Sequence, residues 1–220
     1  EDGNISGQSV TGNDSDIDNT NGQLTWSLVS GGTAATSGTF SFSAGAFNYT
    51  PNANFTGTVS FTYQICDSNG DCDVAVVNLT INPVNDPPVA NDDIATTQED
   101  TPVTFSLTGN DTDLDGNINP ATIDLDPGTP GQQTTFTIPG QGTYVANLIS
   151  GEVTFTPVPN FYGVVTTIQY EVCDDGTPLP ALCDVADIFM TVFGVNDPPV
   201  AVDNSATTPE DTPVTFNITN

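Results

Sequence analysis

Short stretches of alternating polar and apolar residues recur along the chain. Residues 58–65 alternate without a fault, and residues 103–107, 168–172 and 214–218 follow the same period of two. This period is that of a β-strand with one face on a core. No segment carries a helical period of useful length, and turn residues separate the alternating runs. The pattern predicts an all-β fold.

The chain also repeats itself at an offset of 111 residues. Residues 84–90 read Val-Asn-Asp-Pro-Pro-Val-Ala and return at 195–201, while residues 99–105 read Glu-Asp-Thr-Pro-Val-Thr-Phe and return at 210–216. Several motifs recur in the same order, which is the sequence signature of a tandem array.

These repeats predict three units. Residues 1–84 form one repeat that lacks its first strand, residues 85–195 form a complete repeat, and residues 196–220 form the opening strands of a third. Repeats of about 100 residues with about seven short strands predict immunoglobulin-like Greek-key β-sandwiches. Residues 196–209 have two expected roles. They begin a further domain of a longer array, or they complement the first repeat of a neighbouring chain by strand addition.

The chain has four cysteines, Cys66, Cys72, Cys173 and Cys183. If the two members of each sequential pair lie opposite on a hairpin, Tyr63 faces Ala75 and Tyr170 faces Ala186 on the core face. The same parity turns the cysteines outward, where a thiol gains nothing as a core residue. We therefore expect the disulfides Cys66–Cys72 and Cys173–Cys183, with free thiols as the alternative. Disulfides predict an extracellular location, secreted or at the cell surface.

The charge of the chain excludes several functions. It has 28 acidic residues, no Lys, Arg or His, and a formal net charge of −28. Without basic side chains it cannot neutralise phosphates, so nucleic acid is excluded as a partner, as is an anionic membrane surface. No apolar run reaches the roughly 18 residues of a membrane span, so we expect no membrane insertion. Neither His-based nucleophilic catalysis nor a Schiff base is available, and we expect no enzyme.

The acidic residues are clustered rather than dispersed. Asp111, Asp113 and Asp115 place three carboxylates along one short loop. Like charges at such spacing repel one another. A hard divalent cation with six to eight oxygen ligands, Ca²⁺ above all, removes this repulsion. The alternative is a loop whose carboxylates are all solvated.

The ordered set of motifs resembles the cadherin-like repeats of large bacterial surface proteins. Residues 98–102 are similar to the cadherin Pro-Glu-Asn-x-Pro motif, and residues 111–113 to its Asp-x-Asp motif. Residues 173–178 resemble its Asp-x-Gly-x-Pro loop, and residues 84–88 its Asn-Asp-Asn-x-Pro linker. The resemblance implies Ca²⁺ bound between successive β-sandwich domains.

The resemblance also implies particular ligands. At the first junction these are Glu1, Asn85, Asp86, Asp111, Asp113 and Asp174, with Asp115 as an additional candidate. At the next junction they are Glu99, Asn196 and Asp197. A site facing a preceding repeat would use Asp14, Asp16, Asp18 and Asp67. The acidic Asp-Arg-Glu motif of cadherins has no counterpart in residues 156–161, so we expect one or two ions per junction rather than three.

We therefore expect a non-catalytic, calcium-rigidified segment of an extracellular fibre or cell-surface adhesin. Its partners would be adjacent repeats, neighbouring copies in a fibre, and a surface receptor or glycan. The alternative is a carbohydrate- or ligand-binding module, with Trp26, Tyr144 and Tyr162 as an aromatic platform. Packing of these rings in or around the core is the competing interpretation.

Overall fold

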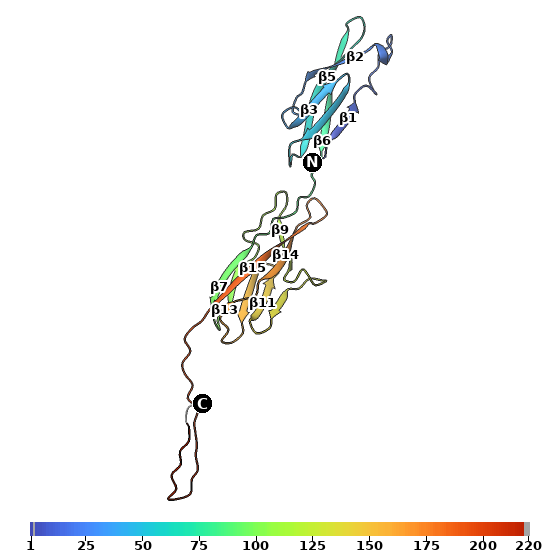
Figure 1. Cartoon of the computed structure of the whole chain (residues 1–220). Coiled ribbons are helices and arrows are strands. Elements are labelled where there is room, and N and C mark those ends of the chain that lie inside the picture. The colour runs from blue at the N-terminus through green and yellow to red at the C-terminus, as the bar shows by residue number, and fades with distance from the viewer. Residues whose placement is uncertain (2, 218–220) are drawn as a thin grey trace.

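The computed structural model describes residue 1 and residues 3–217. Two β-sandwiches lie end to end, and the last segment of the chain runs away from the second sandwich (Figure 1). Ile218, the last residue of the expected alternation, lies outside the described residues. The expected all-β immunoglobulin- and cadherin-like fold is confirmed.

The described residues of the first sandwich form six strands and one short 3-10 turn at Asn21–Gln23. The strands are β1 Ile5–Ser9, β2 Thr25–Ser30, β3 Gly38–Ser43, β4 Ala46–Pro51, β5 Gly57–Cys66 and β6 Cys72–Ile81. They form two antiparallel sheets, one in the order β1-β4-β3 and the other in the order β2-β5-β6. In the long β5–β6 hairpin, Tyr63 pairs with Ala75 and Cys66 with Cys72, as the hairpin parity predicts.

The core of the first sandwich lies between these sheets and follows the alternation of β4 and β5. Tyr49 of β4 and Val59 and Phe61 of β5 are at most 1% exposed. The residues that alternate with the buried ones along each strand are more exposed. The Phe61 ring lies 4.7 Å from that of Phe40 and 5.0 Å from that of Phe47, centroid to centroid. Such tilted aromatic contacts bury large apolar surfaces and hold the two sheets together.

The second sandwich has nine strands. They are β7 Asp93–Gln98, β8 Val103–Ser106, β9 Ile118–Asp124, β10 Thr135–Ile138, β11 Gly142–Asn147, β12 Glu152–Pro157, β13 Gly163–Val164, β14 Ile168–Asp174 and β15 Cys183–Phe193. One sheet has the order β10-β11-β12-β8 and the other the order β13-β15-β14-β9. Strand β7 joins the second sheet by pairing in parallel with β15, from Ile188 opposite Asp93 to Phe193 opposite Gln98.

Both expected disulfides are present, and no cysteine is free among the described residues. The Cys66–Cys72 bond joins the ends of β5 and β6, and the Cys173–Cys183 bond joins the ends of β14 and β15. Each bond therefore closes the tip of a long antiparallel hairpin on its outward side.

Residues 196–217 contain no strand. They are exposed along their whole length and turn back on themselves near Asp211, at the far end of the molecule from the first sandwich (Figure 1). Residues 196–209 therefore pair with no described strand of this chain. Whether they begin a further domain or add to a neighbouring chain stays a prediction.

Candidate metal centre

Three carboxylates converge where the two sandwiches meet. Oxygens of Glu1, Asp86 and Asp115 all lie within 4.8 Å of one another. Glu1 belongs to the first sandwich, Asp86 to the linker after β6, and Asp115 to the loop between β8 and β9. They line a cavity of about 480 Å³ together with Leu114 and Pro178, among others. No basic side chain exists in the chain to neutralise this cluster.

The acidic loop between β8 and β9 is folded around its own carboxylates. The backbone N–H groups of Asp115 and Gly116 both donate to Oδ1 of Asp113 at 3.3 Å. The backbone N–H of Asp86 in turn donates to Asp115, at 3.3 Å from Oδ2. The linker and the loop are thereby held side by side, with their acidic side chains on the same side of the junction as Glu1.

Three buried oxygens at this junction have no hydrogen-bond partner among the described residues. They are Oδ1 of Asn85, Oδ2 of Asp86 and Oδ2 of Asp113. Buried polar atoms in folded proteins are nearly always paired, so unpaired ones indicate a missing partner. Carboxylate and amide oxygens are the ligands that Ca²⁺ prefers. The donor set therefore fits a calcium ion, and no thiolate or imidazole is needed.

Asp174 lies beside this cluster and fixes the linker. It is only 1% exposed. The side-chain amide of Asn85 donates to its Oδ2 at 2.6 Å, and the backbone N–H of Gly176 donates to its Oδ1 at 2.7 Å. The same amide also donates to the carbonyl of Pro180 at 3.0 Å. These bonds turn Oδ1 of Asn85 away from Asp174 and leave it as the unpaired oxygen described above.

Asp111 faces the interior of the second sandwich rather than the Glu1 cluster. Its Oδ1 accepts hydrogen bonds from the Asn91 backbone at 2.8 Å and from the Tyr170 hydroxyl at 3.1 Å. Burial raises the pKa of the Asp111 carboxyl. The Tyr170 pKa is raised as well, first by burial and then by the charge of Asp111. Its role as an ion ligand stays a prediction.

Asp93 joins the Asp111–Tyr170 group and was not found by sequence reasoning. It is 7% exposed, and its Oδ2 has no hydrogen-bond partner among the described residues. Burial, followed by the charge of Asp111, raises the pKa of Asp93 to about 7. The available signal was its parity, because Asp93 and Ala95 share the inward face of β7.

The first sandwich contains the same tyrosine–aspartate pair. Oδ1 of Asp14 accepts from the Tyr63 hydroxyl at 2.9 Å, and its Oδ2 accepts from Nε1 of Trp26 at 2.7 Å. Burial, with Asp14 as the next cause, raises the pKa of Tyr63 to about 12. Asp14 thus anchors its loop to the core of its own sandwich.

The other acids at the outer end of the first sandwich organise their own loops. Asp16 accepts from the backbone N–H groups of Asp18 and Asn19, each at 2.8 Å, and these bonds with the Asn19 side chain lower the pKa of Asp16. Asp67 accepts from three successive N–H groups of its hairpin loop, that of Gly70 at 2.7 Å. Asp16 and Asp67 line one cavity of about 240 Å³.

The residues predicted for the next junction are only partly together. Glu99 is 6% exposed, and its carboxylate accepts a hydrogen bond from the backbone N–H of Val195. Asn196 and Asp197 follow directly and are exposed. This hydrogen bond therefore ties Glu99 to the segment that follows β15. The two candidate linker ligands come directly after Val195 in the sequence.

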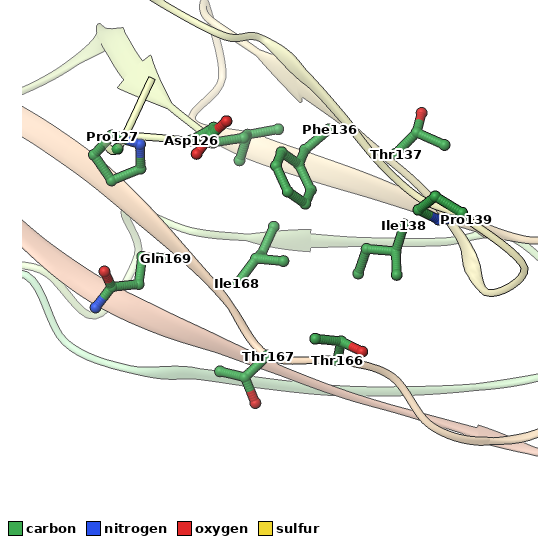
Figure 2. Close-up of a pocket in the computed structure, with 12 residues that line it drawn as sticks. Asp126, Pro127, Phe136, Thr137, Ile138, Pro139, Thr166, Thr167, Ile168 and Gln169 are labelled. Atoms are coloured by element: carbon green, nitrogen blue, oxygen red, sulfur yellow. The ribbon is translucent and has the colours of Figure 1, made fainter. Parts of the chain in front are cut away.

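A third cavity, of about 410 Å³, opens between the sheets of the second sandwich. Figure 2 shows Phe136, Ile138 and Ile168 facing one another across it, with Asp126 at the rim. Its other lining side chains are mostly Pro and Thr. A single carboxylate beside apolar walls offers neither a nucleophile with its base nor a pair of acids. The residues that line this cavity thus form no such constellation.

The aromatic platform of the alternative function is not formed. Tyr144 is fully buried in the second sandwich, at 4.6 Å from the Phe155 ring. Trp26 is half-buried in the first sandwich, where it bonds Asp14. Only Tyr162, 68% exposed, is open to solvent. The core-packing interpretation of these rings is correct for Tyr144 because its strand parity points it inward.

Two β-sandwiches in tandem, with acidic residues at their junction, place this protein in the class of tandem immunoglobulin-like arrays. Residues 1–83 match the family model of the bacterial cadherin-like domain, and residues 85–185 match that of the bacterial Ig domain. The chain is therefore a tandem repeat in which residues 1–83 are cadherin-like and residues 85–185 are Ig-like. Such domains are adhesive or structural modules of extracellular or surface proteins and are generally non-catalytic.

Solved cadherin ectodomains share the fold. Human protocadherin-24 EC1-2 is 16% identical with a TM-score of 0.51, and the match covers 82% of this chain and 85% of that one. Mouse cadherin-23 EC22-24 is 18% identical with a TM-score of 0.50, and the match covers 79% of this chain. The match spans about half, 53%, of the cadherin-23 chain. No curated protein matches the sequence. Within the described residues, no helix has the length and apolarity to cross a membrane.

Proposed function

We propose that the chain is a calcium-stiffened segment of an extracellular fibre or cell-surface adhesin, built from units 1–84, 85–195 and 196–220. The observation that carries this proposal is the convergence of Glu1, Asp86 and Asp115 from both sides of the junction. Asn85 and Asp113, which each have a buried oxygen without a hydrogen-bond partner among the described residues, would supply further ligands. The adjacent repeats, and neighbouring copies of the same chain, are its mechanical partners.

Each residue at the junction has a separate part in this function. Glu1 and Asp86 would hold the ion from the first sandwich and the linker, and Asp113 and Asp115 from the second sandwich. Asp174 positions Asn85 through the 2.6 Å hydrogen bond. When bound, Ca²⁺ supplies the positive charge that the side chains lack. Without it, mutual repulsion of the carboxylates loosens the linker, and the angle between the sandwiches varies.

The affinity expected for this site is modest. Extracellular calcium modules bind with dissociation constants of about 10⁻⁴–10⁻³ M. A ligand present at about one hundred times its dissociation constant stabilises the folded state that binds it by about 2.7 kcal/mol. Saturating calcium should therefore raise the melting temperature of this chain measurably.

The experiment combines small-angle X-ray scattering with thermal melting, in calcium, in magnesium and in chelator. We expect calcium alone to narrow the distribution of end-to-end distances around the extended form and to raise the melting temperature. Magnesium, which demands a smaller octahedral site, serves as the control for general screening of charge. An unchanged distance distribution together with an unchanged melting temperature would refute the proposal.

A further inference from the structure

The loop between Cys173 and Cys183 lies at the junction of the two sandwiches. It connects β14 to β15 at the end of the second sandwich that faces the first (Figure 1). The disulfide joins directly opposite residues of the two strands and closes a covalent ring around residues 174–182. Thr177 and Pro178 of this loop line the same cavity as the carboxylate cluster of the junction.

No apolar side chain anchors this loop in the core. None of residues 174–182 is a buried hydrophobic residue, and Leu179 is 84% exposed. The loop is held instead by Asp174, which accepts hydrogen bonds from the backbone N–H groups of Gly176 at 2.7 Å and Leu182 at 3.2 Å. Segments with few buried apolar contacts open readily. The disulfide at the base of the loop therefore limits the conformations that it can take.

The loop orients the linker residue Asn85. The side-chain amide of Asn85 donates to Oδ2 of Asp174 at 2.6 Å and to the carbonyl of Pro180 at 3.0 Å. A side-chain amide has one donor end and one acceptor end, and the loop offers it two acceptors. Its Oδ1 is therefore turned away from the loop, where it is buried and has no hydrogen-bond partner among the described residues.

The same loop contacts the acidic loop between β8 and β9. The backbone N–H of Asp175 donates to the carbonyl of Asn117 at 2.8 Å, and the side-chain amide of Asn117 donates to Oδ2 of Asp175 at 3.0 Å. Asn117 comes shortly after the candidate ligands Asp113 and Asp115 in the sequence. One closed ring thus touches both the linker and the loop that bring oxygens to the junction.

The disulfide of the first sandwich provides a natural comparison. The Cys66–Cys72 bond also closes the tip of a long hairpin, but at the outer end of its sandwich. Strand β6 runs from Cys72 to Ile81, next to the linker, and its ten residues span about 30 Å. The two disulfides therefore have the same chemistry, and only one of them lies at the junction.

We propose that the Cys173–Cys183 disulfide positions Asn85 for calcium, so that breaking this bond weakens calcium binding at the junction. This inference rests on the calcium function proposed above and adds a redox dependence to it. Cys183 is exposed, so a thiol reductant can reach the bond. A dithiol breaks it in two exchange steps, in which the dithiol becomes a disulfide and Cys173 and Cys183 become thiols.

The expected effect is a change in affinity rather than a loss of the site. Metal sites lose about 10- to 100-fold in affinity when the groups that orient a ligand are removed. The hydrogen bonds of Asn85 can still form in the opened loop, but only in the fraction of molecules whose loop has the right conformation. Affinity falls in proportion to that fraction. We expect calcium to bind about tenfold more weakly after reduction.

The test uses two proteins with one disulfide each. Cys66→Ser with Cys72→Ser leaves only the junction disulfide, and Cys173→Ser with Cys183→Ser leaves only the outer disulfide. Calorimetric titration with calcium, well below the melting temperature, measures the affinity of each protein before reduction with dithiothreitol, after reduction and after reoxidation.

We expect the protein with only the junction disulfide to bind calcium as the unmodified chain does, about tenfold more weakly when reduced, and as before after reoxidation. The protein with only the outer disulfide should bind weakly in all three states. A general loss of stability would change both proteins alike, so a difference between them reports on positioning. Equal affinity of the first protein before and after reduction, or an equal change in both proteins, would overturn the inference.

The route through Asn85 has its own test. Adding Asn85→Ala to the protein with only the junction disulfide should weaken calcium binding and remove most of the difference between the oxidised and reduced states. An undiminished difference would show that the disulfide does not act through Asn85 and would overturn the inference.

Amide hydrogen exchange in chelator examines the loop without calcium. Reduction of the junction disulfide should speed exchange at Gly176 and Leu182, while amides in the middle of β14 and β15 stay protected. Unchanged exchange in the loop would overturn the inference and leave the calcium proposal intact. Calcium binding that does not depend on the junction disulfide would do the same, whereas an unmodified chain that binds no calcium would overturn the proposed function and this inference together.

Discussion

Replacing Asp86 by Asn should have opposite effects with and without calcium. The carboxylate of Asp86 lies within 4.8 Å of those of Glu1 and Asp115. A pair of unit charges at this distance repels by about 0.9 kcal/mol in the dielectric of water and by about 3.5 kcal/mol at an effective dielectric of 20. The substitution removes two of the three repulsive pairs. At low salt and in chelator, it should thus stabilise the junction by about 2 kcal/mol.

In calcium, the effect of Asp86→Asn on the stability of the junction should be the opposite. Asp86→Asn replaces a charged ligand by a neutral one, and calcium sites tune their affinity through the number of charged ligands. The calcium-dependent gain in unfolding free energy should therefore be smaller in the variant than in the unmodified chain. A calorimetric titration should show weaker but not abolished binding of the ion, because the substituted side chain still offers its amide oxygen.

The assay is chemical unfolding at matched pH, in chelator and in saturating calcium, for Asp86→Asn and a control. Asp203→Asn is a suitable control because it removes one charge from an exposed residue far from the junction. We expect the control to shift stability equally in both conditions. If Asp86→Asn raises stability in calcium as much as in chelator, Asp86 is not a calcium ligand at the junction. Equal calcium affinity of Asp86→Asn and the unmodified chain would also contradict a ligand role for Asp86.

Two further predictions concern the stability of the sandwiches. Replacing Cys173 and Cys183 together by Ser should lower the unfolding free energy by about 3 kcal/mol, and the same change at Cys66 and Cys72, which close a shorter loop, should cost somewhat less. Urea unfolding of both variants measures the order, and a greater loss at the shorter loop would contradict the loop argument. Asp93 has a folded pKa of about 7 against an unfolded value near 4, so the unmodified chain should lose stability as pH rises from about 4 to 7. Asp93→Asn should remove this loss and be about 1–2 kcal/mol more stable at pH 8, allowing for solvent screening. Parallel stability curves across this pH range would contradict the assignment.

The long hairpins and their disulfides could be predicted because their signals are local. The alternation of residues 58–65 sets which side chains face inward, and the parity of a hairpin then fixes Tyr63 opposite Ala75. A shift of one residue would turn every apolar side chain of the strand outward, so the register is strongly determined. The outward position of the cysteines follows from the same register.

The arrangement of the acids could be predicted less well. Asp111 and Asp113 are two residues apart, yet one turns to Tyr170 in the core and the other stays at the junction. Tyr170 is 59 residues further along the chain, and the packing of the two sheets brings it to Asp111. Spacing in the sequence indicated a shared role for both. The alternation of β7 indicates that Asp93 faces inward, but its place beside Asp111 and Tyr170 depends on how the strands pack, including the parallel pairing of β7 with β15, which no local pattern reveals.

The parallel pairing of β7 with β15 determines how the second sandwich would carry a pulling force. The chain enters this sandwich through β7 and leaves it through β15, and the two strands run side by side over six residue pairs. Tension applied along the chain pulls the two strands in opposite directions along their common axis. All the hydrogen bonds between them are then loaded at once in shear, instead of being opened one after another from an end. The disulfide at the hairpin tip lies outside this path, so the hydrogen-bonded pair of terminal strands sets the force at which the sandwich begins to open.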